Sequence, residues 1–245
     1  MPEHELWLTK FFNDYLAGPA SAVLSIVGVH VEDPSRPWAN FVTMQIAVAI
    51  VMAVLFAILR SRLSMDRPGK LQQSFEVVYE FLDEQSHEQV GHHSHMYVPL
   101  FGTLFLFILF ANLIGIVPGF ESPTIFAQVP LGCALVAFLY YNISGIRSNG
   151  LGKYLGHFAG PMPFLAPLMI PIEIISHLAR PLSLTIRLYA NMYAGEQVFL
   201  AFLGLTYLAF PALFMGLHVF VSFLQAYVFT LLTMIYVAGA VAEEH

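Results

Sequence analysis

The chain has 245 residues, of which 58% are hydrophobic and 11% are charged, and its formal net charge is −6. Average soluble domains carry about 25% charged residues, so this composition excludes a soluble globular fold, which could not cover its surface with so few charges. The net charge says little about partners, because most of it sits in terminal and loop carboxylates, and we expect no nucleic-acid partner. The single cysteine, Cys133, excludes an intramolecular disulfide and a cysteine-based metal site.

Three apolar stretches are long enough to cross a bilayer as helices, which takes about 20 residues. They cover about residues 41–59, 97–117 and 125–143. We therefore expect residues 41–245 to form a single membrane domain, preceded by residues 1–40 as an external segment. The N-terminus lacks the basic region of a signal peptide, so the first span should be retained.

Basic residues after the first and third spans predict which side of the membrane the loops occupy. They are Arg60, Arg62, Arg67 and Lys70 after the first span, and Arg147 and Lys153 after the third. By the positive-inside rule both loops are cytoplasmic. We therefore expect the N-terminus to be external and the C-terminus to be cytoplasmic.

Residues 71–90 mix apolar side chains with too many acids for a membrane span. The acids are Glu76, Glu80, Asp83, Glu84 and Glu88. The pattern predicts an amphipathic helix that lies at the cytoplasmic interface or against a partner.

A histidine cluster comes just before the second span and consists of His92, His93 and His95. An intramembrane metalloenzyme is one interpretation, but no general base lies convincingly beside the cluster. We favour a loop or interface role and expect no metal and no cofactor.

Two long apolar segments near the C-terminus, residues 162–205 and 207–241, lack a strong polar break. As helices they would be about 66 and 52 Å long, whereas the hydrocarbon core is about 30 Å thick. They must either break near Pro167, Pro171 or Pro181, or lie steeply inclined.

Few ionisable residues remain at membrane depth. They are Glu173, His177, Arg180, Arg187, Glu196 and His218. Glu173, Arg180 and Arg187 are spaced by seven residues, which places them on one face of a helix. His177 and Asn191 lie four residues after Glu173 and Arg187 and join that face. The helix therefore carries a polar stripe.

Arg187 is the most informative residue of this stripe. A cation at the centre of a membrane helix costs roughly 2.5–3.5 kcal/mol on insertion scales, and arginine cannot avoid the cost by losing its proton. Arg187 should therefore face a water path or a buried carboxylate. A structural ion pair with a fixed acid such as Glu173 is the alternative.

The remaining polar residues suggest two separate wet regions instead of one continuous pore. Glu173 would lie on the cytoplasmic side of Arg187 and Glu196 on the external side. Gln225 lies seven residues after His218, so we expect His218 to approach Glu196 and Gln225 to approach Arg187. Simpler roles stay open: interhelical hydrogen bonds for the two acids and a packed neutral imidazole for His218.

The segment Pro181 to Glu196, PLSLTIRLYANMYAGE, resembles the signature of subunit a, the membrane stator of F-type ATP synthases, with its single essential arginine. The resemblance extends to Glu173, His218, Gln225, the terminal Ala242-Glu-Glu-His245 and the upstream Asn112-Leu-Ile-Gly-Ile-Val-Pro-Gly119. It covers roughly residues 40 to 245.

The resemblance implies an all-α polytopic protein of the bacterial inner membrane, with about three ordinary spans, one interfacial helix and two strongly tilted C-terminal helices. It implies a non-catalytic subunit of a proton-translocating ATP synthase, without a catalytic centre of its own. Its partners would be the c-ring, the b-subunit peripheral stalk, other ATP synthase subunits and the lipid bilayer.

The resemblance also implies a proton pathway gated by Arg187. Its residues would be Arg187, Glu196, His218, Glu173, Gln225 and Asn191, with His177 and Arg180 as secondary candidates, although Arg180 could instead snorkel to cytoplasmic headgroups. A secondary transporter with an intramembrane Arg/Glu substrate site is the alternative function. No second copy of the arginine segment supports it.

Overall fold

The computed structural model describes residues 5–27, 36–65, 68–91, 94–117, 119–157, 166–205 and 209–242, and within these ranges it contains helices and no strand. The α-helices are α1 (Trp7–Val27), α2 (Asn40–Ser61), α3 (Lys70–Val90), α4 (Val98–Leu113), α5 (Gln128–His157), α6 (Ala166–Leu205) and α7 (Ala209–Val241). Short 3-10 helices are η1 (Ser94–Met96), η2 (Ile114–Ile116) and η3 (Pro123–Ile125). The expected all-α fold is confirmed.

The two long C-terminal segments are continuous helices. α6 has 40 residues and runs through Pro171 and Pro181, and α7 has 33 residues. At 1.5 Å per residue α6 is about 60 Å long, so it fits a hydrocarbon layer of about 30 Å only if it is strongly inclined. Of the two alternatives for these segments, the break at a proline is therefore wrong.

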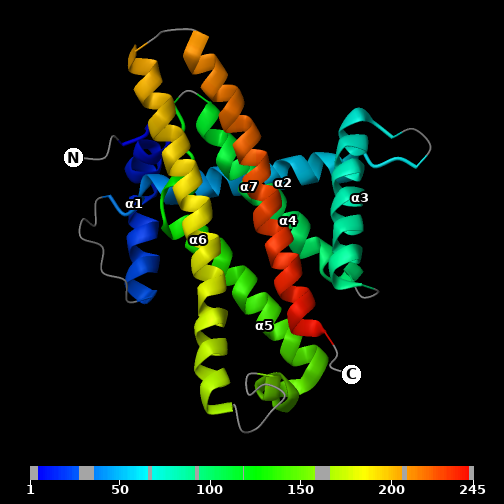
Figure 1. Ribbon diagram of the computed structural model, residues 1–245. Helices are drawn as coiled ribbons and strands as arrows, with labels where there is room; N and C mark the ends of the chain where they lie inside the picture. Colours follow the sequence, from blue (N-terminus) through cyan, green and yellow to red (C-terminus); the bar gives the residue numbers. More distant parts are fainter. Residues whose placement is uncertain are drawn as a thin grey trace.

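α6 and α7 lie side by side near the connection between them and diverge toward their other ends (Figure 1). α5 packs against both helices, and α4 packs against α7. α2 runs across the direction of the long helices and leads to α3, which packs against α4 and α7 (Figure 1).

The three predicted spans correspond to α2, α4 and α5. α5 extends past the predicted end at residue 143, and its helical path is interrupted at Gly150, where φ is +77°. Among the described residues, the helices long and apolar enough to cross a membrane are Asn40–Ser61, Val98–Ile116, Gln128–Tyr154 and Leu213–Val241. α6 is absent from this group, because its charged side chains lower its hydropathy.

The predicted helix over residues 71–90 is present as α3. Leu82 and Ser86 are buried, while Glu76, Glu80 and Glu88 are exposed. The Tyr227 hydroxyl of α7 donates a hydrogen bond to Gln85 Oε1 at 3.1 Å. α3 is thus an amphipathic helix whose inner face is attached to the long C-terminal helix.

The first 40 residues contain a helix, α1, that was not predicted. Its inner face carries two buried polar residues, Thr9 and Asn13. The helix is nevertheless amphipathic, so the sequence held a helical signal here that the prediction of an external segment did not use.

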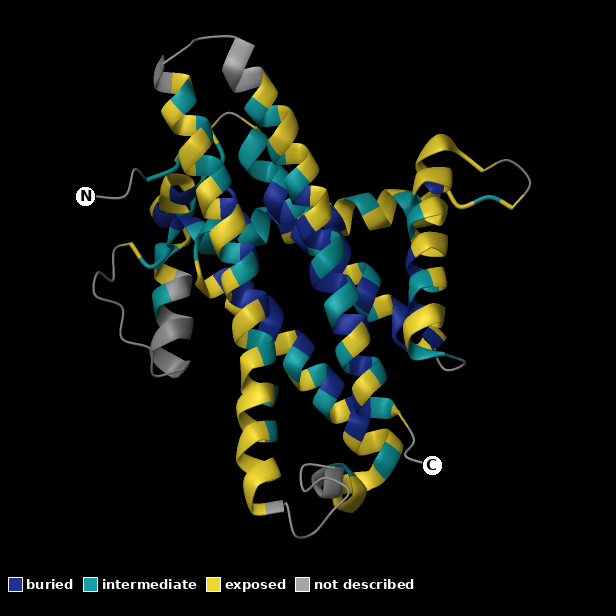
Figure 2. Cartoon of the chain, in the orientation of Figure 1, coloured by how far each residue is buried: buried dark blue, intermediate teal, exposed yellow. Residues whose placement is uncertain are grey.

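The core lies where α4, α5, α6 and α7 meet (Figure 2). Its largest fully buried side chains include Phe101, Phe105 and Ile108 of α4, Tyr141 of α5, Leu188 of α6 and Phe229 of α7. Small buried residues such as Ala137 and Ala226 allow close helix approach. By contrast, the first turns of α6 are mostly exposed (Figure 2).

Candidate functional site

Arg187 is half-buried on α6, next to the fully buried Leu188. In the part of the chain that the structure describes, Arg187 makes no hydrogen bond or ion pair. The acid considered as its fixed partner, Glu173, instead lies 3.9 Å from Arg180 (Oε1 to Nη2). Among the described residues, this permanently charged guanidinium therefore has no counter-ion.

Asn191 and Gln225 join the two long helices one turn away from Arg187. Asn191 Nδ2 donates to Gln225 Oε1 at 2.9 Å. Gln225 is 95% buried, and its Nε2 has no acceptor among the described residues. The structure thus brings Gln225 to Asn191, whereas the sequence predicted an approach to Arg187.

Glu196 and His218 line the same cavity, which has a volume of about 390 Å³. α6 and α7 form two of its sides, and the segment of Gly115, Ile116, Val117, Gly119 and Phe120 forms the third. We call that segment the cavity wall. The structure therefore brings together the two residues that the sequence placed on one access path.

His218 also lines a second cavity of about 180 Å³, together with Asn191 and Gly195. A Cβ atom on Gly195 would lie 3.6 Å from His218 Nδ1, so the imidazole lies directly over this glycine. His218 Nε2 is buried and has no hydrogen-bond partner of good geometry among the described residues. The Asn112 backbone lies near the imidazole. The imidazole thus connects the Glu196 cavity with the Asn191–Gln225 contact.

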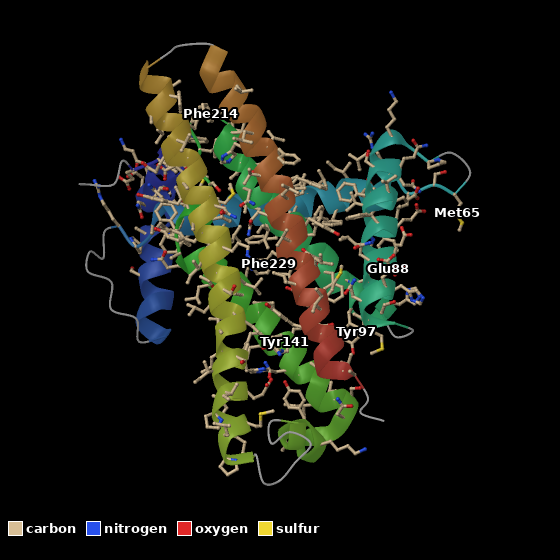
Figure 3. The ribbon with its side chains drawn as sticks, in the orientation of Figure 1. Met65, Glu88, Tyr97, Tyr141, Phe214 and Phe229 are labelled. Atoms are coloured by element: carbon tan, nitrogen blue, oxygen red, sulfur yellow. The ribbon has the colours of Figure 1, made fainter. Side chains whose placement is uncertain are left out.

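An aromatic pair closes the space between α6 and α7 above these cavities. The rings of Phe202 and Phe214 stack with their centroids 4.3 Å apart, and Phe214 lines the smaller cavity (Figure 3). This stack joins α6 to α7 at the edge of the smaller cavity.

A buried hydrogen-bond network supports the cavity wall from within the protein. Thr124 Oγ1 donates to Asn112 Oδ1 at 2.7 Å, and Ser122 Oγ donates to the Ala111 carbonyl at 2.9 Å. Asn112 Nδ2 donates to the Ser222 carbonyl of α7 at 3.4 Å. The side chains of Asn112, Ser122 and Thr124 are all fully buried. Buried polar groups need hydrogen-bond partners, so these bonds fix the chain at the end of the apolar span.

A second polar cluster lies toward the other end of α6. Arg180, besides its contact with Glu173, places its Cζ atom 5.3 Å from the centre of the Tyr236 ring of α7. A guanidinium over an aromatic face gains a cation–π attraction. Arg180 therefore has two contacts within the protein, with Glu173 and with Tyr236.

Asn142 of α5 organises the rest of this cluster. Its Oδ1 lies 2.8 Å from His177 Nε2 and accepts a hydrogen bond of 2.8 Å from the Tyr154 hydroxyl. The Tyr141 hydroxyl lies 3.3 Å from the same His177 nitrogen, and Tyr141 points into the space between α5, α6 and α7 (Figure 3). Sequence reasoning missed Tyr141, Asn142, Tyr154 and Tyr236, because none of them belongs to a periodic pattern.

One residue of the histidine cluster, His95, lies among the described residues. His92 and His93 lie outside the described residues, and His95 Nδ1 lies 3.0 Å from Asp83 Oδ1. Across the described ranges no group of three or more side chains could hold a metal ion.

Comparisons with known proteins agree with the sequence resemblance. A family model described as "ATP synthase A chain" matches residues 41–238. An "ATP synthase subunit a" from Solibacter usitatus (strain Ellin6076) is 70% identical over 234 residues, which is 96% of this chain and 100% of the relative. One from Koribacter versatilis (strain Ellin345) is 49% identical over 242 residues, 99% of both chains. One from Sulfurihydrogenibium sp. (strain YO3AOP1) is 42% identical over 205 residues, 83% of this chain and 98% of the relative.

Proposed function

The chain belongs to the ATP synthase A chain family, the proton-translocating stator subunits of the membrane sector, and we propose that its two polar clusters are two offset half-channels separated by Arg187. This membership sets aside the secondary-transporter alternative. The chain is a multi-pass membrane protein whose partners include other ATP synthase subunits.

The observation that carries the proposal is the position of the unpaired Arg187 between the clusters. Glu173 lies about 21 Å from Arg187 along the helix axis, and Glu196 lies about 13 Å away in the opposite direction. Neither acid is close enough to neutralise the guanidinium permanently, so the charge is available to a partner.

The partner we propose is a ring of proteolipid subunits, each with one carboxyl group at mid-membrane depth. That carboxyl must be neutral while it faces lipid, because an unpaired carboxylate there is strongly disfavoured. Near Arg187 its charged form is favoured, since an opposite charge within about 4–6 Å lowers a carboxyl pKa by about 1–3 units. The proton is therefore released beside Arg187. The guanidinium keeps its own proton, so it does not relay protons, and its charge blocks direct leakage between the half-channels.

The outer surface of α6 supports this docking site. Large apolar side chains there are exposed and recur at helical spacing: Ile175, Leu178, Leu182, Ile186 and Tyr193. An apolar stripe of this size indicates contact with lipid or with another membrane protein. Arg187 follows Ile186 directly, so a ring seated on the stripe would carry its carboxyl groups past the guanidinium.

Each half-channel uses residues that the structure brings together. The external one runs from the cavity of Glu196 and His218 to Asn191 and Gln225. The cytoplasmic one contains Glu173, with His177 and Arg180 held beside it by Asn142 and Tyr236. In this arrangement the N-terminus is external, the C-terminus is cytoplasmic, the membrane is the bacterial inner membrane, α3 lies at its cytoplasmic face, and the b-subunit stalk is a further partner.

Replacement of Arg187 by lysine tests the gate. Lysine carries a compact, strongly hydrated ammonium that can lose its proton when buried, so Arg187→Lys should abolish ATP-driven proton pumping in inverted membrane vesicles. The amount of assembled complex is measured alongside. Near-normal pumping by the assembled variant would refute the gate.

A further inference from the structure

The N-terminal helix α1 packs against the start of α2 (Figure 1). Polar side chains make several of the contacts. The hydroxyls of Thr9 and Thr43 lie 2.7 Å apart and are buried. Asn13 and Trp38 exchange two hydrogen bonds, from the Trp38 amide to Asn13 Oδ1 at 3.0 Å and from Asn13 Nδ2 to the Trp38 carbonyl at 3.2 Å. Buried polar pairs specify one register, so α1 has a defined position on the protein.

A salt bridge and an aromatic contact add to the attachment of α1 to the segment before α2. Arg36 Nη1 lies 3.0 Å from Glu5 Oε2, and the Phe12 and Trp38 rings meet edge to face at 5.5 Å. The chain is therefore attached just before α1, at Glu5, as well as along the helix, at Phe12.

Trp7 extends from the first turn of α1 to the cavity wall. Its ring meets the Phe120 ring edge to face, with centroids 5.8 Å apart. Its Nε1 and Cδ1 atoms lie 3.9 and 4.0 Å from the position that a Cβ atom would take on Gly119. Gly119 has φ +87°, a conformation that favours glycine, and the indole lies at van der Waals distance from it.

The inner surface of the same two residues faces the proton path. Gly119 and Phe120 line the cavity that contains Glu196 and His218. Gly119 and Phe120 therefore contact the cavity and the Trp7 ring at the same time, so Trp7 supports the cavity wall directly. The Asn112–Thr124 and Ser122 hydrogen bonds hold the flanking chain from inside.

We propose that α1 is the outer support of the Glu196–His218 cavity and that Trp7 is the positioning residue through which α1 holds the cavity wall. This role rests on the proposed function, in which the cavity is the external access path. It assigns a purpose to the N-terminal segment, which lies before the matched family region of residues 41–238. Loss of the Trp7 ring should let the wall move outward and make the cavity more accessible to the external solution.

Thiol labelling of the assembled ATP synthase tests this role. Cys133 is buried and is the only cysteine, so a Cys133→Ala background allows one reporter, Met215→Cys, which lies on α7 and lines the cavity. A membrane-impermeant maleimide is applied to right-side-out vesicles. Trp7→Ala should speed labelling by about two- to tenfold, the range expected for losing one aromatic pair.

Three further variants distinguish the role of the Trp7 ring and of α1 docking from unrelated effects on labelling. Trp7→Phe retains a ring against Phe120 and should restore slow labelling. Tyr15→Ala removes an exposed aromatic side chain two turns away on α1 and should leave labelling unchanged. Thr9→Val breaks the buried hydroxyl pair without touching the wall and should speed labelling in the same direction as Trp7→Ala.

Unchanged labelling in assembled Trp7→Ala and Thr9→Val complexes would overturn the proposal. Inverted vesicles provide the control for sidedness, because labelling from that side alone would place the cavity on the cytoplasmic face. Labelling reports on the wall, whereas proton pumping by Glu196→Gln and His218→Ala variants reports on the path. Failure of the proposed function is therefore distinguishable from failure of the α1 role.

Discussion

Asn191 donates a hydrogen bond to Gln225 Oε1 at 2.9 Å, and this contact joins α6 to α7 one turn from Arg187. The bond uses the acceptor of the Gln225 amide and does not involve Arg187. Asn191 and Gln225 therefore link the two long helices beside the residue that we propose as the gate.

We first predict that the effects of Asn191→Ala and Gln225→Ala are not additive. Each removes the same hydrogen bond, which is worth about 0.5–1.5 kcal/mol or about two- to tenfold in an equilibrium. Each variant should slow ATP-driven proton pumping, and the double variant should pump no more slowly than the slower single one. Fully multiplied effects in the double variant would show that the residues act separately.

A second prediction concerns the external path. Glu196→Gln should slow pumping without abolishing it, because water in the cavity and His218 can still relay protons. His218→Ala should also slow pumping, because it removes the group that connects the two cavities. Pumping is measured in inverted vesicles with matched amounts of complex. Normal rates in both variants would remove these residues from the pathway.

The third prediction concerns Asn142, which accepts hydrogen bonds at its Oδ1 in the second cluster. Asn142→Leu leaves Tyr154 and His177 without this acceptor, and an unsatisfied buried polar group costs about 1–3 kcal/mol. The thermal midpoint of the purified complex should therefore fall. Asn142→Asp keeps an oxygen at this position and should lose less stability, and an equal loss in both variants would contradict the assignment.

The fourth prediction concerns Gly145, where α5 approaches the end of α7 closely. A Cβ atom there would lie 2.5 Å from the Tyr154 ring and 2.9 Å from the Ala240 carbonyl oxygen. Gly145→Ala should therefore destabilise the protein by about 1–3 kcal/mol through overpacking.

Gly132 provides the matched control for Gly145 on the same helix. Nothing lies within 4 Å of its added Cβ atom, so Gly132→Ala should be neutral or stabilising by up to about 1 kcal/mol through helix propensity. Both changes are compared in thermal unfolding of the detergent-solubilised complex. Equal midpoints for the two variants would contradict the close approach.

The polar stripe of α6 could be predicted because helical spacing alone places Glu173, Arg180 and Arg187 on one face. The contacts of these residues could not be predicted, because a partner can lie on the same helix or on another one. Glu173 contacts Arg180 on its own helix, whereas Asn191 contacts Gln225 on α7. Spacing defines a face, but only packing between helices selects which side chains meet across it.

The cluster around Asn142 shows the same limit. Tyr141, Asn142 and Tyr154 follow no periodic pattern along α5, and nothing local distinguishes them from packing residues. They become a cluster because His177 and Tyr236 approach from α6 and α7. The attachment of α1 to the start of α2 likewise depends on contacts between segments and not on a local pattern.

The sequence by itself determined that this is an all-α membrane protein, where most of its spans lie, that its last two apolar segments are longer than one upright span, and that Arg187 is a permanent charge within an apolar segment. These conclusions depend on composition, periodicity and segment length, which are local properties. The tertiary structure decided that α6 stays continuous through its prolines, that Glu196 and His218 share a cavity, and that Trp7 supports its wall. These features depend on contacts between residues far apart in the chain, and local patterns do not encode which of them form.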